Sequence, residues 1–395
     1  GWRTEMQLLL LSNGHGEDLS GARLGQALQQ QGASVQAVPL VGDGAPYKQA
    51  QLPVAGRTRS FSTGGLGYAS FAGRLKEILQ GQVIYLLKRS WLLLREARHA
   101  DGIVVVGDVI PVILAWLSRK PVITYLVAYS SHYEGRLRLP WPCRPCLAST
   151  RFAGVFSRDA LSASDLSEQL QRPVEFLGNP FMDGLVPNAA SQRSGRVLLL
   201  PGSRLPEARQ NLERMLALLE ELPAELRLRD FQAALVRDLP AAAVEALAAS
   251  RGWALRSSTS RSLWLKRKGL VLQCCWGQFT TLLQSAQVVV SMAGTASEQA
   301  VGLGKPVLQL AGHGPQFTVG FAEAQRRLLG PAVHCAEGEV DDPATLMASS
   351  ELLVQLLQLP ADELKRYSQE GEQRLGQAGG TERMARKIVE KLQPH

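Results

Sequence analysis

The sequence predicts an α/β protein built from two doubly wound, Rossmann-like domains. A short apolar segment, a glycine-containing turn and a helical pattern follow one another repeatedly along the 395 residues. The apolar segments are continuous rather than alternating, which is typical of parallel strands covered on both faces. After a polar stretch at 187–192 the succession begins again. We therefore expect domains at 1–187 and 188–375, and a helix within 376–395 that can return to the first domain.

Strands are expected where short runs of leucine and β-branched residues end in turn signals. In the first half these runs lie at 7–11, 34–39, 103–106, 122–127, 153–156 and 174–177. In the second half they lie at 196–200, 231–236, 270–273, 288–291, 307–310 and 332–335. Helical patterns fill the gaps, from Asp18 and Pro206 onward and at 295–302, 346–357 and 381–392.

The composition is that of a soluble globular protein, with 45% hydrophobic and 20% charged residues. No run of about 18 uncharged apolar residues occurs, and residues 1–5 lack a signal-peptide pattern. Of the five cysteines, Cys143 and Cys146 have Cys-x-x-Cys spacing, but no second pair completes a zinc site. We expect a reduced, cytoplasmic chain that binds no metal ion.

The net charge of +8 favours anionic partners such as nucleotide phosphates and acidic lipids. Segment 74–98 interleaves apolar and basic residues. Its centre carries Lys88, Arg89 and Trp91, which suit either a peripheral contact with the inner face of an anionic membrane or a core helix with a solvated basic face. Nucleic-acid binding is not expected, because the basic cluster at 261–268 is small.

Two turns of the first half carry candidate catalytic residues. The turn at 13–18 reads Asn-Gly-His-Gly-Glu-Asp, so His15 and Glu17 lie where glycines let a ligand approach the backbone. His15 could deprotonate a hydroxyl or only cap the helix. The pair Gly107-Asp108 directly follows a β-branched strand, and Asp108 could be a general base or a helix N-cap. A nicotinamide oxidoreductase is not favoured, because Leu19 replaces the third glycine of the dinucleotide fingerprint.

Three segments of the second half suit a phosphorylated ligand. In the turn at 201–204, Ser203 and Arg204 can contact a phosphate, unless the turn is an ordinary one with a surface arginine. In the segment 291–298, Thr295 and Glu298 could close a capping box. The alternative is that the backbone N–H groups of this turn hold a diphosphate while Glu298 binds a ribose. A third, glycine-rich segment carries Gln316, which offers both a donor and an acceptor.

Taken together, these motifs resemble those of lipid-A-disaccharide synthases, in the same order over roughly 6–390. The similarity rests on Leu-Leu-Pro-Gly-Ser-Arg at 199–204, Gly-Thr-Ala-Ser-Glu at 294–298, Lys-Pro-Val at 305–307, Gly-Asn-Pro-Phe-Met-Asp at 178–183, and Asp108. The chain looks most like the divergent lipid-A-disaccharide synthase-related group. More broadly it is similar to GT-B glycosyltransferases, such as the muramyl-lipid GlcNAc transferase and the galactolipid synthases.

The resemblance implies a GT-B fold with two domains facing a cleft, and an inverting, metal-independent transfer of a sugar from a UDP-sugar to a lipid hydroxyl. It implies that the nucleotide-sugar is the substrate and that no cofactor is needed. Asp108 or His15 would be the base, with Glu17 in the same turn. The residues at the donor would be Gly202, Ser203, Arg204, Gly294, Thr295, Ala296, Glu298 and Gln316.

The departures from the synthases lie in the acceptor half. Their first loop reads Gly-Glu-x-Ser-Gly-Asp, whereas 14–18 here reads Gly-His-Gly-Glu-Asp, and segment 125–133 replaces their aromatic acceptor segment. Two other functions stay open. One is a nucleotide-sugar 2-epimerase of the same fold, and the other is a catalytically lapsed protein that binds a nucleotide-sugar or a lipid.

Overall fold

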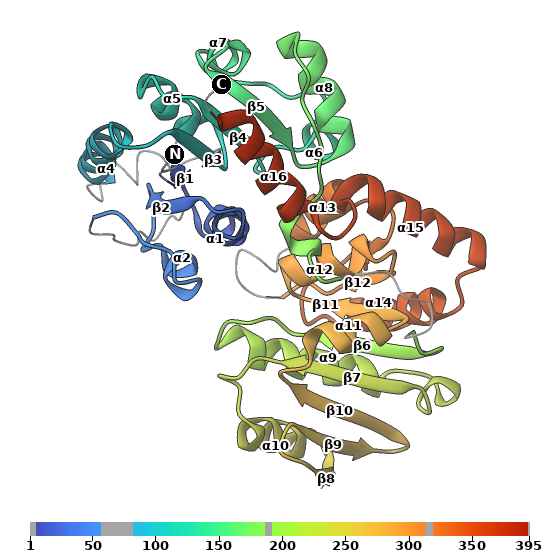
Figure 1. Cartoon of the computed structure of the whole chain (residues 1–395). Coiled ribbons are helices and arrows are strands. Elements are labelled where there is room, and N and C mark those ends of the chain that lie inside the picture. Colours follow the sequence, from blue (N-terminus) through green and yellow to red (C-terminus); the bar gives the residue numbers. More distant parts are fainter. Residues whose placement is uncertain (1–4, 57–81, 186–191, 313–318, 394–395) are drawn as a thin grey trace. The chain divides into compact units, whose positions relative to one another are not determined.

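The computed structural model describes residues 5–56, 82–185, 192–312 and 319–393. The chain divides into two compact units, which can be followed along the sequence in Figure 1. Unit 1 comprises Gly1–Gly184 together with Gly376–His395, and unit 2 comprises Leu185–Leu375. The C-terminal segment therefore belongs to the first unit although it follows the second in sequence.

Unit 1 contains a sheet of five parallel strands in the order β2-β1-β3-β4-β5. The strands are β1 (Gln7–Ser12), β2 (Ser34–Pro39), β3 (Gly102–Val106), β4 (Val122–Leu126) and β5 (Phe152–Ser157). The chain adds β2 on one side of β1 and then crosses to the other side to begin β3. This reversal creates a topological switch point at the carboxyl ends of β1 and β3, where doubly wound sheets bind ligands.

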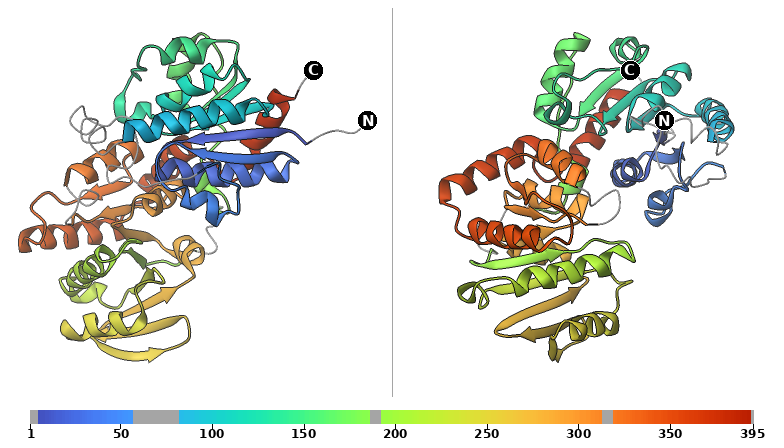
Figure 2. Two further views of the ribbon diagram at one scale, coloured as in Figure 1. Left: turned by 90° about the vertical axis from the view of Figure 1, so that its left-hand side faces the viewer. Right: turned by 180° about the vertical axis from the view of Figure 1, so that it is seen from behind.

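Helices cover both faces of this sheet (Figures 1 and 2). One face carries α1 (His15–Gln30), α2 (Ala45–Gln49) and α16 (Gly380–Leu392). The other carries α4 (Gln82–Ala97), α5 (Val109–Leu117), α7 (Cys143–Ala148) and α8 (Ala160–Leu170). In β1, Leu8 and Leu10 pack on the face that carries α1, and Leu9 and Leu11 pack on the face that carries α4. Both faces of the strand are therefore buried, as its continuous apolar pattern predicted.

Short elements complete unit 1. They are α6 (Ser131–Glu134) and the 3-10 helix η1 (Pro180–Met182). The prediction of a strand at 174–177 is wrong, because this segment makes only an isolated bridge from Glu175 to Phe156.

Unit 2 contains an eight-stranded sheet in the order β13-β12-β11-β6-β7-β10-β9-β8. The strands are β6 (Arg196–Leu200), β7 (Asp230–Leu235), β8 (Ala254–Ser258), β9 (Ser262–Arg267), β10 (Leu270–Trp276), β11 (Val288–Ser291), β12 (Val307–Gln309) and β13 (Val333–Cys335). β6 pairs in parallel with β7 on one side and with β11 on the other. A second switch point therefore lies at the carboxyl ends of β6 and β11.

One edge of this sheet is not parallel, contrary to the expected alternation of strands and helices. β9 runs antiparallel to β10, and β8 runs antiparallel to β9. The basic cluster at 261–268 thus forms strand β9, in which Leu263 and Leu265 are buried while Lys266 is exposed. Such alternation is typical of an antiparallel edge with one solvated face.

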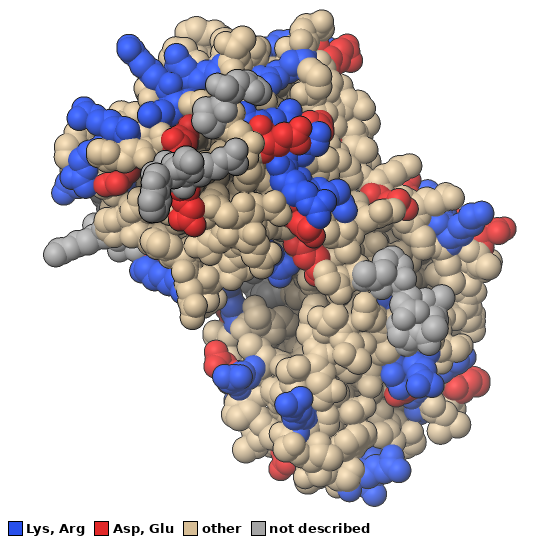
Figure 3. Space-filling view, in the orientation of Figure 1, with Lys and Arg blue, Asp and Glu red and all other residues tan. Residues whose placement is uncertain are grey.

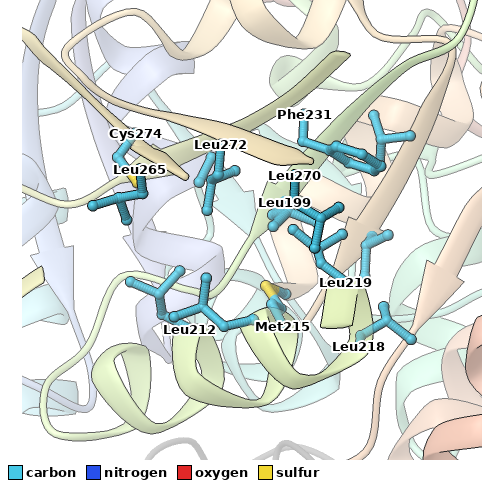
Figure 4. Packing of buried hydrophobic residues seen from close by; sticks show 14 of the residues in the cluster. Leu199, Leu212, Met215, Leu218, Leu219, Phe231, Leu265, Leu270, Leu272 and Cys274 are labelled. Carbon is cyan, nitrogen blue, oxygen red and sulfur yellow. The ribbon is translucent and has the colours of Figure 1, made fainter. Parts of the chain in front are cut away.

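The core of unit 2 lies between the sheet and α9 (Glu207–Glu220), α10 (Ala241–Ser250) and α14 (Pro343–Leu357). Figure 4 shows Leu212 and Met215 of α9 beneath Leu199 and Leu272 of the strands. Burying each such side chain contributes about 1.5–3 kcal/mol. The helices that contact the sheet or one another outside this cluster are α11 (Phe279–Ser285), α12 (Gly294–Gly302), α13 (Val319–Leu329) and α15 (Ala361–Leu375). A 3-10 turn, η2 (Ala224–Leu226), follows α9.

The five cysteines are free thiols. Within the described ranges, no group of His, Cys, Asp and Glu side chains has an arrangement that could hold a metal ion. None of the described helices has both the length and the apolar character that crossing a membrane requires.

Candidate functional site

The two phosphate-suited turns of unit 2 lie side by side at its switch point. Leu200 and Ser291, the last residues of β6 and β11, are register partners. Beyond them, the Met292 N–H donates to the carbonyl of Leu200 at 2.9 Å. The turns at 201–204 and 292–294, which lie far apart in sequence, therefore leave the sheet together. Such a point is a general place for ligand binding in doubly wound sheets.

Hydrogen bonds to its backbone carbonyls hold the turn after β6, and its polar side chains are exposed. Gly202 has a φ of 108°, a conformation that side chains disfavour. The buried Asn211 of α9 donates from Nδ2 to the carbonyl of Pro201 at 2.9 Å, and the carbonyl of Arg204 accepts from Ala208 N–H at 2.8 Å. Ser203 and Arg204 are exposed, so their polar groups can reach a ligand in solvent.

The turn after β11 presents the N-terminus of α12. Ala293 is the N-cap and makes no side-chain capping bond, so the alternative in which Thr295 and Glu298 close a capping box is wrong. The first N–H groups of a helix lack intrahelical partners and carry partial positive charge. Here they belong to Gly294, Thr295 and Ala296. Glu298 lies one turn further along and is 9% exposed.

Two buried serines, which the sequence pattern did not single out, hold this turn in place. Ser297 donates to the carbonyl of Ala293 at 2.6 Å and lies 2.8 Å, oxygen to oxygen, from Ser291. The N–H of Ala293 in turn donates to the hydroxyl of Ser291 at 3.0 Å. These bonds fix the direction in which α12 begins.

The candidate catalytic turns of unit 1 also meet at a switch point. Ser12 and Val106, the last residues of β1 and β3, are register partners. Asn13 Nδ2 donates to Asp108 Oδ1 at 2.9 Å, and the Ile110 N–H donates to the same oxygen at 3.3 Å. Asp108 is therefore the N-cap of α5, one of the two roles expected for it, and it is 2% exposed.

Glu17 lies beside this pair because two glycines leave room for it. A Cβ on Gly107 would lie 3.2 Å from Glu17 Cγ, and a Cβ on Gly14 would lie 2.5 Å from Glu17 Oε2. The structure thus brings Glu17 toward Asp108. His15 opens α1 in the same turn, and Gln316 falls outside the described residues.

A buried polar cluster, not predicted from the sequence, lies beneath this turn. Ser12 Oγ donates to Asp18 Oδ1 at 2.5 Å and lies 2.5 Å from the hydroxyl of Tyr47. Burial raises the pKa of Asp18 from 3.8 to about 7. The helical period could have revealed it, because Asp18 shares a face with Ala22 and Gly25, which are buried.

Of the three residues predicted to contact a membrane, the prediction for Arg89 is wrong. Arg89 is 2% exposed, and its Nε donates to the carbonyl of Pro39 at 3.0 Å. Its Nη1 donates to the carbonyl of Ala55, so the guanidinium holds α4 against the loop after β2. Lys88 and Trp91 of the same helix are exposed.

The comparisons with known proteins give structural matches only. No protein-family profile and no curated protein sequence matches the chain. A calicheamicin glycosyltransferase matches with a TM-score of 0.57 at 15% identity over 99% of each chain. A spinosyn rhamnosyltransferase complexed with thymidine diphosphate matches with a TM-score of 0.55 at 15% identity, over 97% of this chain and 100% of that chain.

The matches also include UDP-GlcNAc 2-epimerase from Neisseria meningitidis bound to UDP-GlcNAc, with a TM-score of 0.51 at 18% identity over 98% of this chain and 99% of that one. Nothing in these matches ties the chain specifically to lipid-A-disaccharide synthases. At such identities the similarity establishes the fold, and the predicted fold class is confirmed. The chain has the GT-B fold of two Rossmann-like domains, which glycosyltransferases and nucleotide-sugar 2-epimerases share.

Proposed function

We propose that the protein is an inverting, metal-independent glycosyltransferase that moves a sugar from a UDP-sugar to a lipid hydroxyl. The observation that carries this proposal is the meeting of two phosphate-suited turns at the β6/β11 switch point. The fold is compatible with it, because solved structures that match the chain include glycosyltransferases.

The donor would bind to unit 2 through its diphosphate. The exposed guanidinium of Arg204 and the first N–H groups of α12 are positive groups at the ends of neighbouring strands. Both suit the charge that develops when a nucleoside diphosphate leaves the sugar, and fixed donors of this kind lower a barrier without a metal ion. The carboxylate of Glu298 would accept hydrogen bonds from the ribose.

The acceptor would be activated in unit 1. Its hydroxyl would lose a proton to Asp108, with His15 as the alternative base, and would attack the anomeric carbon as the bond to the diphosphate oxygen breaks. Attack from the face opposite the leaving group inverts the configuration. Nucleotide-sugar and acceptor are substrates in this scheme, and no cofactor takes part.

Arg204→Ala is expected to lower turnover at least tenfold and to weaken the binding of UDP, because the loss of one oxyanion donor costs about 2–4 kcal/mol of barrier. Calorimetry against a panel of nucleotides and nucleotide-sugars would identify the donor and measure this change. Arg256→Ala is a matched control, since Arg256 is equally exposed on β8, four strands away from β6. Unchanged binding in folded Arg204→Ala would remove Arg204 from the site.

A nucleotide-sugar 2-epimerase is the rival function, since the matching structures include such an enzyme. An epimerase needs no acceptor, whereas a transferase does. Conversion of the nucleotide-sugar with no lipid present would therefore overturn the transferase proposal. Tight UDP binding with neither reaction, across a panel of lipids, would indicate a lapsed binding protein.

The lipid acceptor leads to a proposed membrane contact on α4. Four apolar side chains spaced by three or four residues are exposed there, namely Ile84 (63%), Leu87 (64%), Trp91 (63%) and Leu94 (36%). Lys88, Arg95 and Arg98 are exposed on or beside the helix. Basic side chains gather over this part of unit 1 in Figure 3. Apolar and basic groups together suit the surface of an anionic bilayer.

Vesicle sedimentation tests this contact. We expect the chain to bind vesicles that contain phosphatidylglycerol more tightly than vesicles of phosphatidylcholine alone, and Trp91→Ser to weaken that binding several-fold. Trp141→Ser is the matched control, because Trp141 is 84% exposed elsewhere in unit 1. Equal losses in both variants, or none in either, would contradict a contact through α4.

A further inference from the structure

The switch point of unit 1 holds a buried polar pair whose amide partner has no assigned role. Asn13 is 1% exposed and Asp108 is 2% exposed, although they follow different strands. The 2.9 Å bond from Asn13 Nδ2 joins them, and the Ile110 N–H reaches the same carboxylate oxygen. Two donors therefore converge on Oδ1 of Asp108, which favours the ionised carboxylate.

A contribution to the stability of the fold does not explain why an asparagine is buried at position 13. Among the residues that the structure describes, its buried amide oxygen has no hydrogen-bond partner, which is a cost in free energy. The residue that follows β3 is a glycine, and any side chain there would collide with this amide, because a Cβ on Gly107 would lie 2.8 Å from Asn13 Oδ1. Gly107 moreover has a φ of 144°. A half-satisfied buried amide and a glycine that makes room for it are typical of a functional site.

We propose that Asn13 is a positioning residue that holds the carboxylate of Asp108 ionised and in one orientation for proton transfer. This inference rests on the proposed role of Asp108 as the base. The amide donates to the charged form of Asp108 and so opposes the effect of burial, which favours the neutral form. Without the amide, the carboxyl would hold its proton to higher pH and would turn more freely.

Other titratable groups of the described residues also face this pair. Glu17 approaches from α1, beside Gly107. Cys143 approaches from α7. Burial is the main cause that raises the pKa of its thiol to about 12, and the nearby Cys146 and Asp108 raise it further. The thiol therefore stays neutral at the pH of an assay. Glu17→Gln is included below to separate the effect of this carboxylate from that of Asn13.

Asn13→Ala is expected to lower kcat about tenfold to a hundredfold and to shift the acid limb of kcat/KM to higher pH by about one unit, with the affinity for UDP unchanged. Asn13→Asp should shift the limb further, because it places a second carboxylate against the first. Asn179→Ala is the matched control, since Asn179 is equally buried in unit 1 and its Oδ1 instead accepts from the Phe181 N–H. The acid limb of Asn179→Ala should stay in place. We expect Asn13→Ala to shift the limb also when it and its parent both carry Glu17→Gln. No shift in that background would show that Asn13 acts through Glu17 instead.

A measurement without substrate separates this inference from the proposed function. In protein labelled with ¹³C at aspartate carboxyls, the signal lost in Asp108→Asn identifies Asp108. We expect it to titrate at higher pH in Asn13→Ala than in the wild type, whatever the reaction. Identical titrations would overturn the positioning role even in an active transferase. Shifted titrations together with full activity in Asp108→Asn would instead overturn the assignment of Asp108 as the base.

Discussion

Asp108→Asn is expected to lower turnover by about a hundredfold to ten-thousandfold while the chain keeps its fold. Asparagine has the shape of aspartate and keeps an oxygen that can accept from Asn13 Nδ2 and the Ile110 N–H, as Asp108 Oδ1 does. The N-cap of α5 therefore survives, and the group lost is the acceptor for the proton. Steady-state transfer from the donor identified by calorimetry measures the effect.

The fold of this variant is checked by its thermal unfolding midpoint and by its UDP affinity, which should match those of the wild type. Turnover within about threefold of the wild type would show that Asp108 only caps α5. His15→Ala would then test the alternative base, since His15 opens α1 at the same switch point.

The second large effect concerns stability and comes from Asp18. Burial raises its pKa from 3.8 to about 7, so the folded chain favours the protonated carboxyl. A raised pKa in the folded state contributes stability that is full below about pH 4 and is lost as the pH rises through 7. Between pH 5 and pH 8 the wild type should therefore lose about 3 kcal/mol of unfolding free energy relative to Asp18→Asn, which cannot ionise.

Urea denaturation at the two pH values measures this difference. Asparagine keeps an oxygen for the Ser12 hydroxyl, so the cluster with Tyr47 can persist in the variant. Glu168→Gln removes an exposed carboxylate from α8 of the same unit and should leave the pH dependence unchanged. Parallel stability curves for the wild type and Asp18→Asn would refute a buried, protonated Asp18.

Much of the fold could be predicted because its strands are continuous apolar runs. β2, β6 and β11 occupy the expected residues, and most of the others differ by one or two at their ends. β8 was not predicted, because its five residues are all exposed and show no apolar pattern. β9 was not predicted, because its basic residues suggested a surface cluster and not a strand. The run at 174–177 is apolar enough for a strand, but it makes only one bridge at the sheet edge.

The individual turns of the candidate site could be predicted from the sequence, but which turns lie next to each other could not. Glycines and polar residues after strands point to ligand loops, yet only the strand order places 201–204 beside 292–294. The bond between Asn13 and Asp108 spans 95 residues and leaves no local signal. Arg89 shows the opposite error, because its basic residue type suggested a surface while tertiary contacts bury it.

A crystal structure of the full chain with UDP tests the central claim most directly. We expect the diphosphate within hydrogen-bond distance of the Gly294, Thr295 and Ala296 N–H groups and of the Arg204 guanidinium, with the ribose at Glu298. A diphosphate bound away from both the 201–204 turn and the start of α12 would contradict the proposed donor site.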